Sequence, residues 1–84
     1  MAAIIVQAGN TVVPAFLALE ELGFKVTIEG GSIVAASENG RFVADDPVAV
    51  LGLIKLVETR GWDWSASDEQ IDAAVGRFGW GAEA

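Results

Sequence analysis

The chain has 84 residues, 52% of them hydrophobic, and its twelve acidic and five basic side chains give a net charge of −7. A chain of this length supports one hydrophobic core, so we expect a single domain over residues 1–80 and a frayed tail at residues 81–84. The sequence contains no cysteine and no histidine. Disulfides, thiolate chemistry, and the commonest general base and transition-metal ligand are therefore excluded.

The distribution of charged and apolar residues predicts where in the cell the protein is located and which partners it does not bind. No apolar run reaches the roughly 18 to 20 residues that cross a bilayer, because Glu20 and Glu21 interrupt the longest candidate. The first apolar stretch is short and has no basic residue ahead of it, unlike a secretory signal. A soluble cytoplasmic protein is expected. Its negative charge repels nucleic acid and anionic lipid, so neither is an expected partner.

The first two predicted elements are a strand and a helix. Residues 3–7 are short and β-branched, which is typical of a strand. Thr11 is a good N-cap for a helix that runs over residues 12–22. Gly23 supplies the left-handed residue after this helix, and Phe24 is placed to pack back on it as in a Schellman ending.

Three further strands are predicted to form a meander. Residues 24–29 alternate apolar and polar side chains, and the Gly30-Gly31 turn that follows pairs Ile28 with Ile33. Asn39-Gly40 is a second hairpin signal, which predicts that Glu38 pairs with Arg41. The two registers put one set of apolar side chains on a single face: Phe24, Val26, Ile28, Ile33 and Phe42.

Two helices complete the chain. Asp45-Asp46-Pro47 is typical of a helix start, and the helix should run from Pro47 to about Arg60, where Gly61 stops it. Ser67 and Gln70 form a capping box for a third helix, whose expected buried stripe is Ile71, Ala74, Val75 and Phe78. The element order β-α-β-β-β-α-α predicts an α+β two-layer sandwich. Its mixed four-stranded sheet would have strand one parallel to strand two, and the first two helices would cover one face.

Two motifs have a structural interpretation that outweighs a chemical one. Gly9-Asn10-Thr11 lies between a predicted strand and a helix, where a phosphate is often bound, but it matches no phosphate-binding pattern, so plain capping is expected. Asp45 and Asp46, with Glu38 nearby, resemble an acidic pair, but an Asp before proline is a common cap. We therefore expect no catalytic, cofactor-binding or metal-binding residue, and no enzyme activity.

All three tryptophans lie in the last 23 residues, beside an excess of acidic side chains. Tryptophan is enriched at interface hot spots, and nearby carboxylates suit a cationic partner. The candidate partner-binding residues are Trp62, Asp63, Trp64, Asp68, Glu69, Asp72 and Trp80. The alternative is that Trp62 closes the second helix and that Trp64 or Trp80 fills the core between helices two and three.

Helices one and two carry few charges, and a surface helix normally keeps a polar face. One of them is a candidate self-association surface, which would make the protein a homodimer. The alternative is that the alanines at positions 15, 18 and 49 form a harmless outer face.

Three segments carry a resemblance: residues 9–19, 42–47 and 66–72. They look like small uncharacterised acidic bacterial proteins, similar in size and charge to the immunity proteins of bacterial toxin systems. The resemblance implies an inhibitory binding protein, such as an immunity protein or antitoxin, that masks a cationic partner. The alternative is a structural or regulatory module that acts by homo-oligomerisation or by docking on a larger complex.

Overall fold

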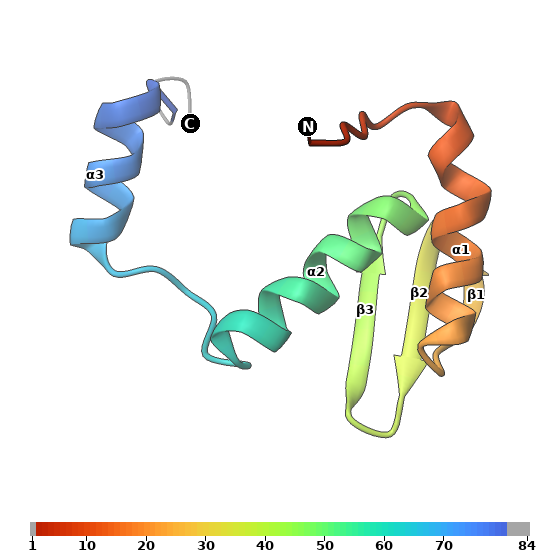
Figure 1. Cartoon of the computed structure of the whole chain (residues 1–84). Helices are drawn as coiled ribbons and strands as arrows, with labels where there is room; N and C mark the ends of the chain where they lie inside the picture. The colour runs from red at the N-terminus through yellow and green to blue at the C-terminus, as the bar shows by residue number, and fades with distance from the viewer. Residues whose placement is uncertain (1, 81–84) are drawn as a thin grey trace.

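The computed structural model describes residues 2–80, which form three α-helices, a short 3₁₀ turn and one three-stranded antiparallel sheet (Figure 1). The elements are η1 (Gly9–Thr11), α1 (Val12–Glu21), β1 (Lys25–Glu29), β2 (Ser32–Ser37), β3 (Gly40–Ala44), α2 (Pro47–Arg60) and α3 (Asp68–Phe78). The α+β class and the three helices are confirmed. The predicted mixed four-stranded sheet and the order beginning with a strand are wrong. The predicted tail at residues 81–84 lies outside the described residues.

The segment predicted as strand one forms no strand. Residues 2–8 have no regular secondary structure, and Ile4, Ile5 and Val6 are 71–87% exposed. A strand needs a ladder of backbone hydrogen bonds to a neighbour as well as β-branched residues, and β1, the expected neighbour, pairs with β2. The chain instead turns into α1 through η1, where the backbone N–H and the hydroxyl of Thr11 both donate to the Ala8 carbonyl, at 3.0 and 2.7 Å.

The end of α1 follows the predicted Schellman pattern. Gly23 has a φ of 93°, and its N–H donates to the Glu20 carbonyl at 2.9 Å. The N–H of Phe24 donates to the Leu19 carbonyl at 3.1 Å. These two bonds satisfy carbonyls that the helix leaves free, and they direct Phe24 onto the core around the fully buried Leu19.

The first hairpin has the predicted register. Ile28 pairs with Ile33 and Val26 with Ala35, around the Gly30-Gly31 turn. Both glycines have positive φ, at 58° and 86°, which the two-residue turn requires.

The second hairpin differs from its prediction by two residues. Ser37 pairs with Gly40 and Ala36 with Arg41, so Glu38 and Asn39 occupy the turn and Glu38 does not pair with Arg41. A type I′ turn at Asn39-Gly40 would need a positive φ at Asn39, and no non-glycine residue within residues 2–80 has one. The Ser37 hydroxyl instead accepts a hydrogen bond from the Asn39 N–H at 3.2 Å. A shift of two keeps every side chain on its predicted face.

The core lies between one face of the sheet and helices α1 and α2, as predicted. Its buried members are Leu19, Ala35, Phe42, Val50 and Ile54. Helix α2 begins at an N-cap, Asp46, whose Oδ1 accepts from the Ala49 N–H at 2.8 Å. Ile28 was expected in this core but is 73% exposed, because it lies near the end of an edge strand. Ala15, which the alternative interpretation placed on a harmless outer face, is buried.

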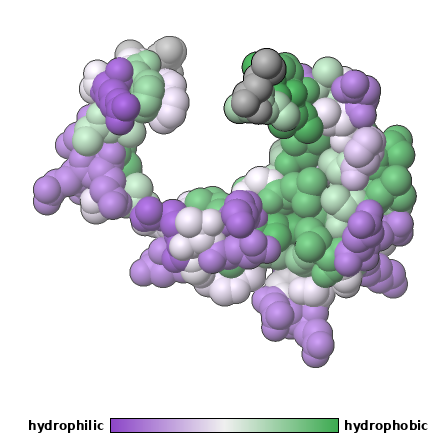
Figure 2. Space-filling model, in the orientation of Figure 1, coloured by the Kyte–Doolittle hydropathy of each residue, from purple (hydrophilic) through white to green (hydrophobic). Residues whose placement is uncertain are grey.

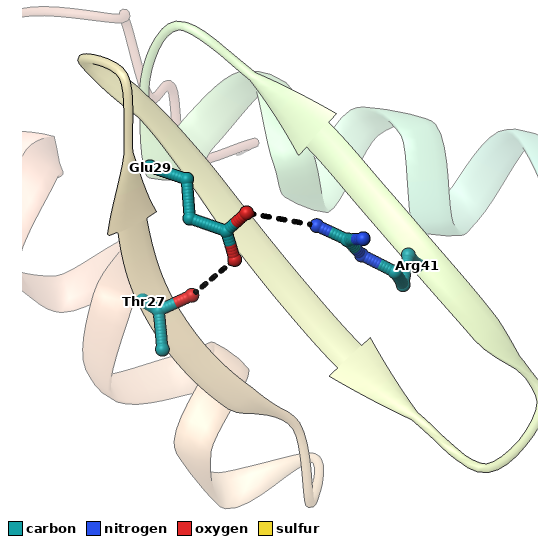
Figure 3. Close-up of polar contacts among 3 residues, drawn as sticks. All are labelled: Thr27, Glu29 and Arg41. Atoms are coloured by element: carbon teal, nitrogen blue, oxygen red, sulfur yellow. Dashed lines mark hydrogen bonds and ion pairs between the residues drawn. The ribbon is translucent and has the colours of Figure 1, made fainter.

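The other face of the sheet carries an ion pair. Glu29 of β1 and Arg41 of β3 meet across β2, with Oε1 and Nη2 3.2 Å apart, and Glu29 also accepts from the Thr27 hydroxyl (Figure 3). Val34 of β2 lies midway between them in the register and is only 3% exposed.

Helix α3 stands away from the sheet and the other helices (Figure 1). Its capping box is confirmed, since the Ser67 hydroxyl accepts from the Gln70 N–H and the Gln70 side chain accepts from the Ser67 N–H. The predicted burial of its apolar stripe is wrong. Ile71 and Phe78 are exposed, and no residue of α3 is buried. None of the helices within residues 2–80 is long and apolar enough to cross a membrane.

Candidate functional site

Residues 61–80, here called the C-terminal arm, contain every sequence-predicted partner-binding residue, and all seven of these side chains are exposed. The arm starts at Gly61, whose φ of 81° ends α2 and turns the chain. Arg60 then fixes the first residues of the arm. Its Nε donates to the Trp64 carbonyl at 2.9 Å and its Nη2 to the Ser65 carbonyl at 3.2 Å.

Trp62 is the point where the arm touches the folded core. Its ring stacks on Phe42 of β3, with centroids 5.4 Å apart, and Phe42 meets Phe24 edge-on at 5.8 Å. The indole also lies against Gly40. Such aromatic pairs add packing energy beyond their buried area. Trp62 therefore holds the arm to the sheet with one face of its ring, while more than half of the side chain remains exposed.

Trp64 lies two residues further along, over a shallow groove, and is 47% exposed. The groove has a volume of about 280 Å³. Its lining residues are Arg41, Phe42, Val43, Leu53, Leu56, Val57, Trp62 and Trp64. Trp64 does not plug the core between α2 and α3, because α3 does not pack there. The indole offers a large apolar surface that forms part of the wall of a mostly apolar groove.

Trp80 is not brought together with the other two tryptophans. Its ring stacks on Phe78 at the end of α3, with centroids 4.7 Å apart, and Arg77 lies 5.0 Å from the centre of the Phe78 ring. Trp80 therefore belongs to the apolar end of α3 and not to the groove beside Trp64.

The arm that contains these tryptophans also contains four carboxylates: Asp63, Asp68, Glu69 and Asp72. Asp68 and Glu69 occupy the first turn of α3, where negative charge also stabilises the helix dipole. None of the four forms a salt bridge within residues 2–80. Helical spacing places Glu69 and Asp72 away from the stripe formed by Ile71 and Phe78. Helix α3 thus has an acidic face and a separate apolar face.

A second surface lies at the other end of the chain. It is formed partly by α1 and α2, one of which the sequence indicates as a self-association surface, and partly by the N-terminal segment, which the sequence did not indicate. The N-terminal groove has a volume of about 650 Å³. Its lining residues are Ile4, Ile5, Val6, Gln7, Asn10, Thr11, Pro14, Ala15, Val48 and Leu51. Figure 2 shows the apolar surface that extends from the N-terminal segment over α1. No lining residue is charged.

The motifs given a structural interpretation have structural roles. Asp46 caps α2 as predicted. The predicted N-cap role of Thr11 is wrong, because its hydroxyl makes no cap hydrogen bond to α1 and instead donates to the Ala8 carbonyl in η1. No group of three or more acidic residues within residues 2–80 is placed to hold a metal ion. Comparisons with protein-family models, curated proteins and solved structures find no match to this chain.

Proposed function

We propose that the protein is a small acidic protein-binding protein whose C-terminal arm covers a cationic surface of another protein in the cytoplasm. Its mode of action would be stoichiometric masking, as in an immunity protein or antitoxin. One observation carries the proposal: the arm presents exposed tryptophans and carboxylates that are not members of the buried core cluster.

Helix α3 of the arm is expected to be only marginally stable without a covering partner. Helix α3 has 11 residues, and an isolated helix shorter than about 12 to 15 residues is marginal in water. Gly76 lies in its interior and lowers its helix propensity further. An exposed apolar stripe on such a helix gains stability when a partner covers it. This favours a binding role for the arm.

The charge of the arm indicates the kind of partner. The arm contains four acidic side chains and one basic side chain. Rim charges of one sign accelerate encounter with a partner of the opposite sign, whereas a buried aromatic side chain mainly slows dissociation. Trp64 is the expected anchor, and Asp68 and Asp72 are the expected steering charges.

The test is a binding measurement with a partner recovered by crosslinking through the arm. Trp64→Ala should weaken binding by about 2 kcal/mol, roughly 30-fold, without unfolding the domain. Asp68→Lys and Asp72→Lys should slow association and reduce its dependence on salt. Glu21→Lys makes the same charge change on α1, away from the arm, and should change the association rate less. An acidic partner, or loss of folding in Trp64→Ala, would contradict the proposal.

A further inference from the structure

We propose that two copies of this chain form a symmetric dimer in which the apolar face of α3 from each copy occupies the N-terminal groove of the other. This inference goes beyond the cationic partner, because it uses the apolar face of α3 and leaves the acidic face free. The two proposals share only Leu53 and Leu56 of α2, which also line the groove beside Trp64. Three observations support the dimer: the large accessible area of the single chain, the two exposed apolar surfaces that could cover each other, and the uncharged outer face of α2.

The isolated chain exposes far more surface than a compact protein of its size. Its accessible area is 6555 Å², about 1,800 Å² more than the roughly 4,700 Å² expected for a folded monomer of this mass. Its radius of gyration is 15.2 Å, against about 12 Å for a compact domain of this length. Burying that excess on each of two copies would give an interface in the range of obligate homodimers.

Two apolar regions of residues 2–80 contribute to this exposed surface. The first is the N-terminal groove, with Ile4, Ile5 and Val6 among the most exposed large apolar side chains. The second is the face of α3 that carries Ile71 and Phe78. The groove is uncharged, so it does not repel an acidic helix. A helix with an apolar stripe laid into an apolar groove is a common recognition geometry.

The outer face of α2 extends the same interface. Ala49, Gly52 and Leu53 are exposed on one side of this helix, and Leu56 continues the row without a charge. A second α2 can pack along this row. If the two α2 helices pack antiparallel, the groove end of one, at Val48, lies beside the end of the other from which α3 departs. This arrangement repeats the same contact twice and closes under two-fold symmetry.

The effect of salt on binding distinguishes this dimer from a complex with the cationic partner. Each copy has a net charge of −7, so two copies repel each other and added salt should maintain or tighten the dimer by screening that repulsion. Binding of a cationic protein should weaken with salt. Failure of one proposal therefore leaves the other standing.

The first experiment is sedimentation equilibrium on the full chain at micromolar concentration. The wild type should sediment with twice the chain mass of 8.7 kDa. Leu53→Lys and Phe78→Lys should each give a folded monomer, because both positions are exposed in the single chain and would be buried in the dimer. Leu17→Lys, exposed on α1 and absent from the groove lining, should remain a dimer with the same charge change. A wild-type monomer, or a dimer that both Leu53→Lys and Phe78→Lys leave intact, would overturn the proposal.

The second experiment is disulfide crosslinking, which tests whether the groove is filled by α3 of the same copy or of the other copy. The sequence has no native cysteine, so only the introduced cysteines can form a disulfide. Val48→Cys and Val75→Cys are placed in separate chains of different mass, which are mixed and oxidised. A disulfide joining the two chains is expected, and Leu17→Cys in place of Val48→Cys should give little. A chain that carries both Val48→Cys and Val75→Cys is oxidised alongside. If its disulfide forms within one chain, α3 folds onto its own groove and the two-copy proposal is wrong.

Discussion

The indole of Trp62 lies so close to Gly40 that a β-carbon at position 40 would come within 2.5 Å of ring atom Cζ2. Gly40 is the first residue of β3, and Trp62 is the first arm residue after Gly61. The absence of a side chain at position 40 therefore allows the ring to rest on the strand backbone and stack on Phe42. This contact joins the arm to the sheet.

Gly40→Ala should destabilise the domain by about 1 kcal/mol, because the new methyl group displaces Trp62 and weakens its stacking on Phe42. The free energy of unfolding from urea titration checks this. Gly9→Ala is the control, since nothing lies within 4 Å of its added β-carbon. In a Trp62→Ala background the penalty of Gly40→Ala should largely vanish. An unchanged penalty there would mean that the contact does not cause it.

Val34 and the ion pair above it should contribute very different amounts to stability. Val34→Ala removes two buried methyl groups and should lower the free energy of unfolding by about 1 to 3 kcal/mol. Glu29→Gln should lower it by less than about 1 kcal/mol, because both charged side chains of the pair are 59% exposed and water screens them. Thermal unfolding of the two variants at low and high salt makes the comparison. A larger loss of unfolding free energy in Glu29→Gln than in Val34→Ala would contradict this order of contributions.

The parts of the fold that the sequence predicts well depend on residues close together in the chain. The Schellman ending at Gly23, the Asp46 cap and the Ser67 capping box each involve backbone groups within about six residues. Their hydrogen bonds join groups that are already close neighbours along the chain. The first hairpin belongs to the same class, because the two glycines of its turn set the register.

Two mispredicted features are local, the Asn39-Gly40 turn and the Thr11 cap, where another short-range hydrogen bond replaces the expected one. The other mispredicted parts depend on distant surfaces. The spacing of Ile71 and Phe78 indicates an apolar helix face, but it does not say whether that face meets the chain's own core or a partner. Ile4 and Ile5 have the composition of a strand and lack a neighbouring strand. Trp62 was expected near the end of α2, and its actual partner, Phe42, is twenty positions earlier. The sequence indicates Arg60 only as the end of a helix, whereas in the structure its guanidinium also donates to carbonyls of the next segment.

Arg60 should control how tightly the first residues of the arm are held. Its guanidinium donates to two carbonyls, those of Trp64 and Ser65, so Arg60→Ala leaves both to water and loosens the segment. Limited proteolysis should then cut residues 61–67 several-fold faster, while unfolding of the core by urea changes little. Lys55→Ala, which removes a basic residue of α2 whose only ion pair is with Glu58 of the same helix in the described residues, should leave the cleavage rate unchanged. Equal acceleration in both variants would exclude a specific role for Arg60.

Helix α3 should respond to substitution independently of the core, because no residue of it is buried. Gly76→Ala should raise the local stability of α3 by roughly 0.5 to 1 kcal/mol, since nothing lies within 4 Å of the added β-carbon. Ser67→Ala removes the N-cap hydroxyl and should lower the local stability by about 1 kcal/mol. Both are measured by amide hydrogen exchange in a Leu53→Lys background, where we expect a monomer.

The exchange of α3 amides should slow in Gly76→Ala and quicken in Ser67→Ala, whereas the amides of β2 should not change in either variant. This pattern would identify α3 as a separately unfolding unit. In the dimer, Gly76→Ala should also tighten association, because a helix that is already formed loses less conformational freedom when it enters the groove. If β2 amides shifted together with those of α3, the helix would unfold with the core. Its apolar face would then already be covered within one chain, and it would not be available to a partner.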